Sequence, residues 1–134
     1  MNAFRIASYA FLGLAALVHL VAFVVETILF EHPKTLGTFG ITNPVVGATA
    51  KPWALTQGFM HLFLAVGAVA GLALMATDHL VAGRSVALYA SGMMLCSALV
   101  IFSVDVRMYR VALLLGIFPA AALGCLLAPV MTGA

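Results

Sequence analysis

Four strongly polar side chains stand in or at the edge of the long apolar stretches of this 134-residue chain. His19 and Glu26 are seven residues apart, and Gln57 and His61 are four apart, so each pair lies on one face of a helix. A carboxyl group and an imidazole can exchange a proton, and an amide can hydrogen bond to either of them. Ionisable groups inside a bilayer are costly and indicate a functional site. We therefore expect an intramembrane site for binding or acid–base chemistry.

The depths of these residues in the membrane match. At 1.5 Å of rise per residue, Glu26 lies roughly 6 Å and Gln57 about 5–7 Å below the membrane surface, His61 about 12 Å and His19 about 17 Å. The four side chains can thus form one polar column. We expect Gln57 to lie within hydrogen-bond reach of Glu26, so that replacing Glu26 by leucine would cost stability.

The composition places the chain in a membrane. Hydrophobic residues make up 65% of it and charged residues 7%, whereas a soluble domain has about 25% charged residues. So few charges exclude a soluble globule and a disordered chain. A net charge of +2 is too small to indicate nucleic-acid binding, and two cysteines make no disulfide framework.

Charge-free runs then give the elements that position the polar residues. Each of the four runs is long enough to cross a hydrocarbon core about 30 Å thick, and in lipid each must be helical. The runs are residues 6–25, 54–77, 85–104 and 111–134. We predict an all-α fold, a four-transmembrane-helix up-down bundle over residues 4–30, 52–76, 84–104 and 108–130. It forms a single integral membrane domain, 1–134, of a multi-pass protein of the cell membrane.

A long segment, residues 31–51, separates the first two predicted helices, and we expect this loop to be ordered. Asn43 followed by Pro44 indicates a short interfacial helix over residues 44–50, and Pro52 can open the next helix. Loops of this length are often functional, although a surface loop resting on lipid headgroups fits as well. We expect the loop to cover the mouth of the bundle, with Phe39 and Trp53 buried against protein.

The remaining signals concern packing and orientation. We interpret the third helix as carrying a packing face with heptad-like spacing, and we expect no bond between Cys96 and Cys125. The positive charges are distributed unevenly between the two sides of the membrane, which weakly favours both termini outside. One side carries Lys34, Lys51, Arg107 and Arg110, and the side of the termini carries Arg5 and Arg84. The residues of the packing face are Tyr89, Met93, Cys96, Val100 and Ser103.

Short motifs along most of the chain carry a family resemblance. The chain resembles a family of small membrane proteins catalogued as domain of unknown function 1304. The resemblance implies four helices and a membrane location, and it supplies no activity. The matching residues are His19, Glu26 and Phe30, Phe39 with Gly40, Gln57 with Gly58, Phe63 with Leu64, and Pro119 with Ala120. The chain departs from the family pattern at Thr56, His61, Leu62 and Gly116.

Several functions fit these residues. The first is a pocket that binds a small lipophilic or amphiphilic molecule, with His19, Glu26, Gln57, His61 and Phe39 as the ligand-binding residues. The alternatives are an accessory subunit of a larger membrane complex, a membrane-embedded isomerase-type enzyme, and a proton-coupled small exporter. We predict no metal site and no cofactor, apart from haem on His19 or His61 as a remote option. Expected partners are the lipid bilayer and a homo-oligomer or larger complex, with no nucleic acid.

Overall fold

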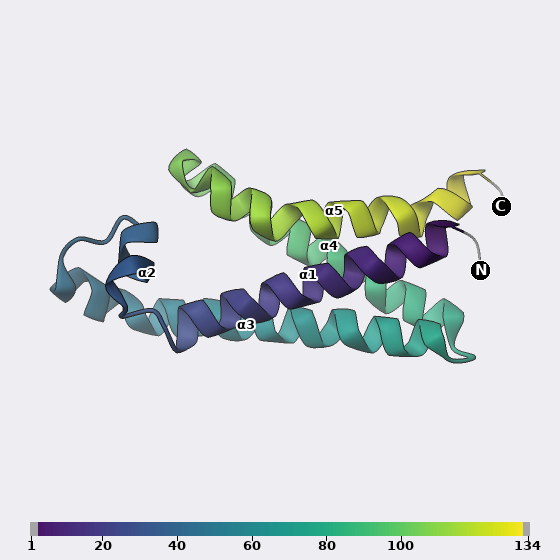
Figure 1. The fold of residues 1–134 in the computed structure, drawn as a ribbon, viewed down its shortest axis with the longest axis horizontal. Coiled ribbons are helices and arrows are strands. Elements are labelled where there is room, and N and C mark those ends of the chain that lie inside the picture. The colour runs from purple at the N-terminus through teal and green to yellow at the C-terminus, as the bar shows by residue number, and fades with distance from the viewer. Residues whose placement is uncertain (1–2, 133–134) are drawn as a thin grey trace.

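Four long helices make up most of the computed structural model, which describes residues 3–132 (Figure 1). All four are long and apolar enough to cross a membrane, and no strand occurs within the described range. This confirms the predicted all-α bundle of four candidate spans. The elements are α1 (Ala3–Thr27), α2 (Pro33–Thr38), α3 (Pro44–Ala76), α4 (Leu80–Val104), the 3₁₀ turn η1 (Val106–Met108) and α5 (Tyr109–Thr132).

The helices form an up-down bundle in which sequence neighbours pack side by side. α1 packs mainly against α3 and α5, and α4 packs against the same two helices, so α1 and α4 lie across the diagonal. The start of α1 and the end of α5 lie at one end of the bundle, and α2 lies at the other (Figure 1). The ends of α1 and α5 agree with both termini lying on one side; residues 1–2 and 133–134 are outside the described range.

Small residues let these helices approach closely. Ala15, Ala68, Ala87 and Ala122 are fully buried in the core. A Cβ atom on Gly71 would come within 2.9 Å of the backbone nitrogen of Ala87, so a glycine is needed where α3 meets α4. In lipid the hydrophobic effect does not drive helices together, because the lipid tails are as apolar as the side chains. Close packing of small residues drives their association instead.

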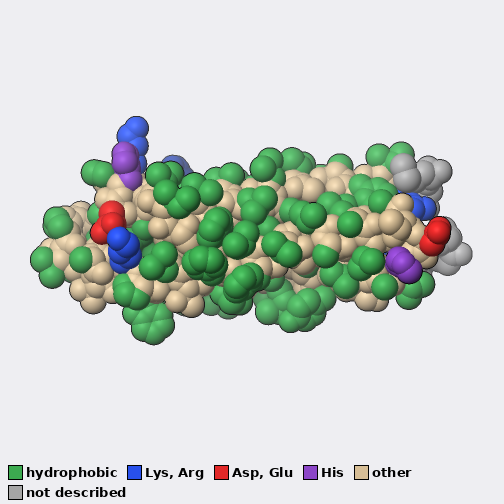
Figure 2. Space-filling model, turned by 90° about the horizontal axis from the view of Figure 1, so that it is seen from below, with side chains coloured by type: hydrophobic (Ala, Val, Ile, Leu, Met, Phe, Trp, Pro, Cys, Tyr) green, Lys and Arg blue, Asp and Glu red, His purple; other side chains and the backbone are tan. Residues whose placement is uncertain are grey.

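Charged side chains gather at the two ends of the molecule, and the face between them is mostly apolar (Figure 2). At the end with the termini, Tyr9 and Arg5 both donate to the carbonyl oxygen of Met75, at 2.6 and 3.1 Å. The Arg84 guanidinium donates to the carbonyl oxygen of Leu126. The bonds from Tyr9 and Arg5 satisfy the Met75 carbonyl in the last turn of α3, where carbonyls lack a partner within the helix.

The helix α3 differs from the expected short helix followed by a new one at Pro52. It is continuous for 33 residues, with Pro52 in its interior, so the predicted break there is wrong. The predicted N-cap is right, because the Asn43 side chain accepts a hydrogen bond from the Val45 amide at 2.9 Å. A proline removes the bond to the carbonyl four residues earlier, here that of Ala48, which is exposed. At roughly 50 Å, α3 is longer than the hydrocarbon core and reaches beyond it.

The segment between α1 and α3 contains a helix that the sequence interpretation missed. Pro33 opens α2, and the His32 side chain accepts a hydrogen bond from the Lys34 amide at 3.3 Å. Gly40 has a left-handed φ of 69° and turns the chain back, so that the Ile41 amide donates to the Leu36 carbonyl at 2.8 Å. This turn places Phe39 beside the end of α1.

Candidate functional site

The two helix faces predicted from spacing meet inside the bundle. His19 on α1 and His61 on α3 are both fully buried, with ring centroids 5.0 Å apart in an edge-to-face arrangement. Glu26 lies two turns along α1 from His19, and its Oε2 atom is 3.7 Å from Nε2 of His61. The Nε2 atom of Gln57 is 3.5 Å from the same imidazole nitrogen. The structure therefore brings the four side chains into one column.

Glu26 is buried and its carboxyl group is incompletely satisfied. The residue is only 6% exposed, and its Oε2 atom has no hydrogen-bond partner among the described residues. The 3.7 Å separation from His61 is too long for a hydrogen bond. An unsatisfied buried carboxyl group costs free energy, so this arrangement does not stabilise the fold.

Gly58 allows this carboxyl group to lie at the contact between α1 and α3. A Cβ atom on Gly58 would come within 2.6 Å of the Thr27 Cγ2 atom and 3.3 Å of the Glu26 Cβ atom. The Thr27 side chain has little freedom to move, because its hydroxyl donates to the Phe23 carbonyl at 2.6 Å. A glycine at position 58 thus lets α3 approach α1 beside Glu26.

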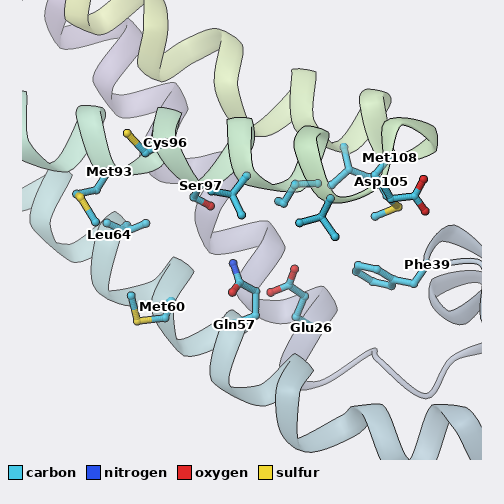
Figure 3. A pocket seen from close by; sticks show the side chains of 14 residues that line it. Glu26, Phe39, Gln57, Met60, Leu64, Met93, Cys96, Ser97, Asp105 and Met108 are labelled. Carbon is cyan, nitrogen blue, oxygen red and sulfur yellow. The ribbon is translucent and has the colours of Figure 1, made fainter.

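Gln57 does not make the bond expected of it. No hydrogen bond joins Gln57 to Glu26 in the described part of the chain, so that expectation is wrong. Gln57 and His61 are one helical turn apart on α3, and the amide turns along its own helix toward the imidazole. Gln57 and Glu26 nevertheless lie beside one another and face the same cavity (Figure 3).

His19 is held by its own helix. Its Nδ1 atom is 3.0 Å from the Ala15 carbonyl oxygen, and since that oxygen can only accept, Nδ1 carries the proton. Its Nε2 atom and the Nδ1 atom of His61 have no hydrogen-bond partner among the described residues. The two imidazoles therefore form the deep end of the column, packed behind Glu26.

A cavity of about 520 Å³ opens in front of Glu26 (Figure 3). Its polar groups are Glu26 on α1, Gln57 on α3 and Ser97 on α4, with Asp105 after the end of α4. The Ser97 hydroxyl oxygen is buried and has no hydrogen-bond partner among the described residues. The rest of the lining is mainly apolar and rich in sulfur: Phe39, Met60, Leu64, Met93, Cys96, Val100, Ile101, Val104, Asp105, Met108 and Val111.

This cavity opens sideways between α3 and α4. Three of its lining residues, Met60, Met93 and Val100, are also 46, 40 and 59% exposed on the outside of the bundle. The face of α4 that we interpreted as a packing face is therefore not packed, and Tyr89 on it is 71% exposed. Heptad spacing showed that these residues share a face, but the spacing does not say whether a helix or a hollow lies opposite.

A second cavity of about 420 Å³ lies on the α2 side of Glu26. It shares Glu26, Phe39 and Gln57 with the first cavity, and Phe30 and Trp53 add two more aromatic rings. Phe39 is half-buried and packs against Phe30 with ring centroids 5.8 Å apart. Trp53 lines the cavity but is 78% exposed, so the expectation that it is buried against protein is wrong.

Two ion pairs lie on the outside at this end of the bundle. Lys51 donates to Glu31 at 2.6 Å, and Arg107 donates to Asp105 at 2.9 Å. The hydrogen bonds from the Arg107 side chain and amide hold the pKa of the Asp105 carboxyl below its usual value. Asp105 at the cavity mouth is therefore ionised near neutral pH and already compensated by Arg107.

The predicted site residues thus divide into two groups. Glu26, Gln57 and Phe39 line both cavities, while His19 and His61 line neither and pack behind the carboxyl group. Sequence reasoning missed Ser97, because a serine within an apolar helix carries no spacing signal of its own. Within the described residues no group of three or more His, Cys, Asp or Glu side chains could hold a metal ion, and Cys96 and Cys125 are free.

Comparison with known proteins places the chain in a family. No curated protein and no solved structure matches it. Residues 13–127, which include α3, α4, most of α1 and α5 and the lining of both cavities, match the family described as "Protein of unknown function (DUF1304)". The match agrees with the resemblance carried by His19, Glu26 and the Gln57 region. The chain therefore belongs to the DUF1304 family of proteins and has the four apolar helices of a multi-pass membrane protein.

Proposed function

We propose that this protein binds a small amphiphilic molecule in the cavity in front of Glu26. The observation that carries the proposal is a buried carboxyl group, 6% exposed, with an unpartnered oxygen, in the wall of an otherwise mainly apolar cavity. Such an arrangement costs stability when nothing binds to it. Ligand sites typically combine an apolar wall with a few polar groups that fix the orientation of the ligand.

The polar groups define where the head of the ligand would lie. Glu26, Gln57 and Ser97 offer a carboxyl oxygen, an amide and a hydroxyl from three different helices. A ligand group that hydrogen bonds to Ser97 would satisfy a hydroxyl oxygen that has no partner among the described residues, and the Glu26 carboxyl group lies in the same wall. This gain in hydrogen bonding favours the bound state.

The apolar part of the cavity suits the body of the ligand. A volume of about 520 Å³ falls in the range of about 300–1,000 Å³ that is typical of small-molecule sites. Methionine side chains such as Met60 and Met93 adapt to the shape of what they contact. Because the opening lies between two membrane helices, the ligand would enter from the bilayer.

The test is to identify the small molecules that co-purify with the protein in nanodiscs. Organic extraction followed by mass spectrometry compares the parent with Val100→Trp, which would fill the cavity. The matched control is Leu99→Trp, because Leu99 is equally exposed, 58% against 59%, but lines a different groove between α4 and α5.

We expect at least one amphiphile to be enriched on the parent and on Leu99→Trp, and to be depleted about tenfold on Val100→Trp. Equal enrichment on both tryptophan variants would place the bound molecule elsewhere. If nothing beyond bulk lipid is enriched on any of the three proteins, the binding function is wrong. A protein partner recovered in its place would favour an accessory subunit.

A further inference from the structure

We infer that the ligand carries a positively charged alkylammonium head, which binds between Glu26 and the aromatic rings of the second cavity. This inference rests on the proposed function, since it names the chemical class of the molecule that the site binds. It follows from the charges, the rings and the adjacency of the two cavities.

The charge of the lining is negative. No lysine, arginine or histidine lines either cavity, and Glu26 lines both of them. Asp105 at the mouth is already paired with Arg107 at 2.9 Å. Glu26 is the other carboxyl group of the lining, and its neighbouring basic group is the buried imidazole of His61, with no lysine or arginine beside it. A cationic ligand would supply that partner in a site shielded from water, where an isolated carboxylate is otherwise unfavourable.

Two basic side chains at this end of the bundle are engaged elsewhere, and Lys34 lines neither cavity. Lys51 is paired with Glu31 at 2.6 Å, and Arg110 lies over the Tyr109 ring with 5.6 Å between its Cζ atom and the ring centroid. Both are on the exposed end of the bundle and line neither cavity. The structure therefore provides Glu26 with no lysine or arginine of its own.

The aromatic rings add a second feature of ammonium sites. Phe30, Phe39 and Trp53 line the second cavity together with Glu26. Aromatic faces attract cations, and cages of several rings recognise alkylated ammonium groups in proteins. A neutral or anionic head would gain nothing comparable from three rings beside a carboxylate.

The two cavities are adjacent where the head would lie. Glu26, Phe39 and Gln57 form part of both walls, so a head on the ring side continues into a tail on the side of Met93 and Cys96. The site thus has two neighbouring compartments, one lined by a carboxyl group and aromatic rings and the other mainly apolar. That division matches a long-chain ammonium compound.

The experiment compares three probes with the same twelve-carbon chain. Dodecyltrimethylammonium is the cation, dodecanol is neutral and dodecanoate is the anion. Binding of tritiated dodecyltrimethylammonium to the protein in zwitterionic nanodiscs is measured against empty nanodiscs, and each unlabelled probe is used as a competitor. A second titration uses tritiated dodecanol directly.

Two variants and one control locate the interaction. Glu26→Gln should lower the affinity for dodecyltrimethylammonium at least tenfold and change the affinity for dodecanol less than threefold. Phe39→Leu should weaken the cation about threefold, because it keeps an apolar side chain but removes a ring. Glu31→Gln removes an exposed carboxylate at the same end of the bundle, outside both cavities, and should change neither probe.

The outcomes separate the two proposals. Tightest binding of the cation, lost selectively in Glu26→Gln, supports the ammonium head. Saturable binding of all three probes with equal affinity, or tighter binding of dodecanoate, overturns the ammonium head and leaves amphiphile binding in place. If no probe binds saturably above empty nanodiscs, both proposals are wrong. If Glu31→Gln weakens the cation as much as Glu26→Gln, attraction to the surface explains the selectivity and the site is overturned.

Discussion

The imidazole of His61 approaches the carboxyl group of Glu26 to 3.7 Å across the α1–α3 interface, and the two groups make no hydrogen bond. His61 is fully buried and Glu26 nearly so. The Glu26 oxygen that faces His61, Oε2, has no hydrogen-bond partner among the described residues. His61 therefore does not use up the hydrogen-bonding capacity of the carboxyl group.

Replacement of Glu26 by leucine should leave the fold intact or stabilise it. The hydrogen bond to Gln57 that would have made this substitution costly is not formed, and apolar replacements of buried ionisable groups are often neutral or stabilising. We expect an apparent melting temperature in detergent equal to or above that of the parent, together with loss of bound amphiphile. A drop of more than about 5 °C in the melting temperature would show that Glu26 has a structural role.

Substitution of Gly58 by alanine should weaken the bundle beside the site. The new Cβ atom would meet the Thr27 Cγ2 atom at 2.6 Å and the Phe23 carbonyl oxygen at 3.3 Å, so α1 must shift. Overpacking of this kind costs about 1–3 kcal/mol. Gly67→Ala is the control on the same helix, because its Cβ atom would lie at an ordinary 3.6 Å from the Ala90 Cβ atom.

Reversible unfolding in mixed micelles measures both glycine variants. We expect Gly58→Ala to lose stability and dodecanol binding together, while Gly67→Ala keeps both. Equal stability of the two variants would mean that α1 and α3 are not in close contact beside Glu26.

The up-down topology places the α2 end and the α3–α4 link on opposite sides of the membrane. Single cysteines at Gly37 and Asp78, in a Cys96→Ser, Cys125→Ser background, should react with an impermeant maleimide from opposite sides of sealed vesicles. Reporter fusions at the two chain ends should both lie on the side of Asp78. Labelling of positions 37 and 78 from the same side would contradict the arrangement of the four helices.

Much of this site could be predicted from the sequence because helix geometry fixes relative depth. Seven-residue spacing on α1 and four-residue spacing on α3 placed His19, Glu26, Gln57 and His61 on facing sides, and they do meet. Spacing gives the face and depth of a residue but not the rotamer of its side chain. That is why the column was predicted and the Glu26–Gln57 hydrogen bond was predicted wrongly.

The rest of the site depends on tertiary structure. Phe39 reaches the cavities only because Gly40 reverses the chain after α2, and no periodic pattern records where such a turn points. Pro52 signals a helix start in most contexts, yet α3 runs through it. The cavity that Ser97 lines takes its wall from α1, α3, α4, η1 and α5 together, so its position depends on how several helices pack.

Photo-crosslinking tests most directly whether an alkylammonium compound binds at Glu26 with its chain in the larger cavity. A dodecylamine with a diazirine at the end of its chain is irradiated with the protein in nanodiscs, and the adducts are mapped by mass spectrometry. We predict adducts concentrated on Leu64, Met93 and Cys96, lost in Glu26→Gln and reduced by unlabelled dodecyltrimethylammonium. Adducts spread evenly over the lipid-facing surface, with Leu99 and Leu113 labelled as strongly and no effect of Glu26→Gln, would contradict a binding site at Glu26.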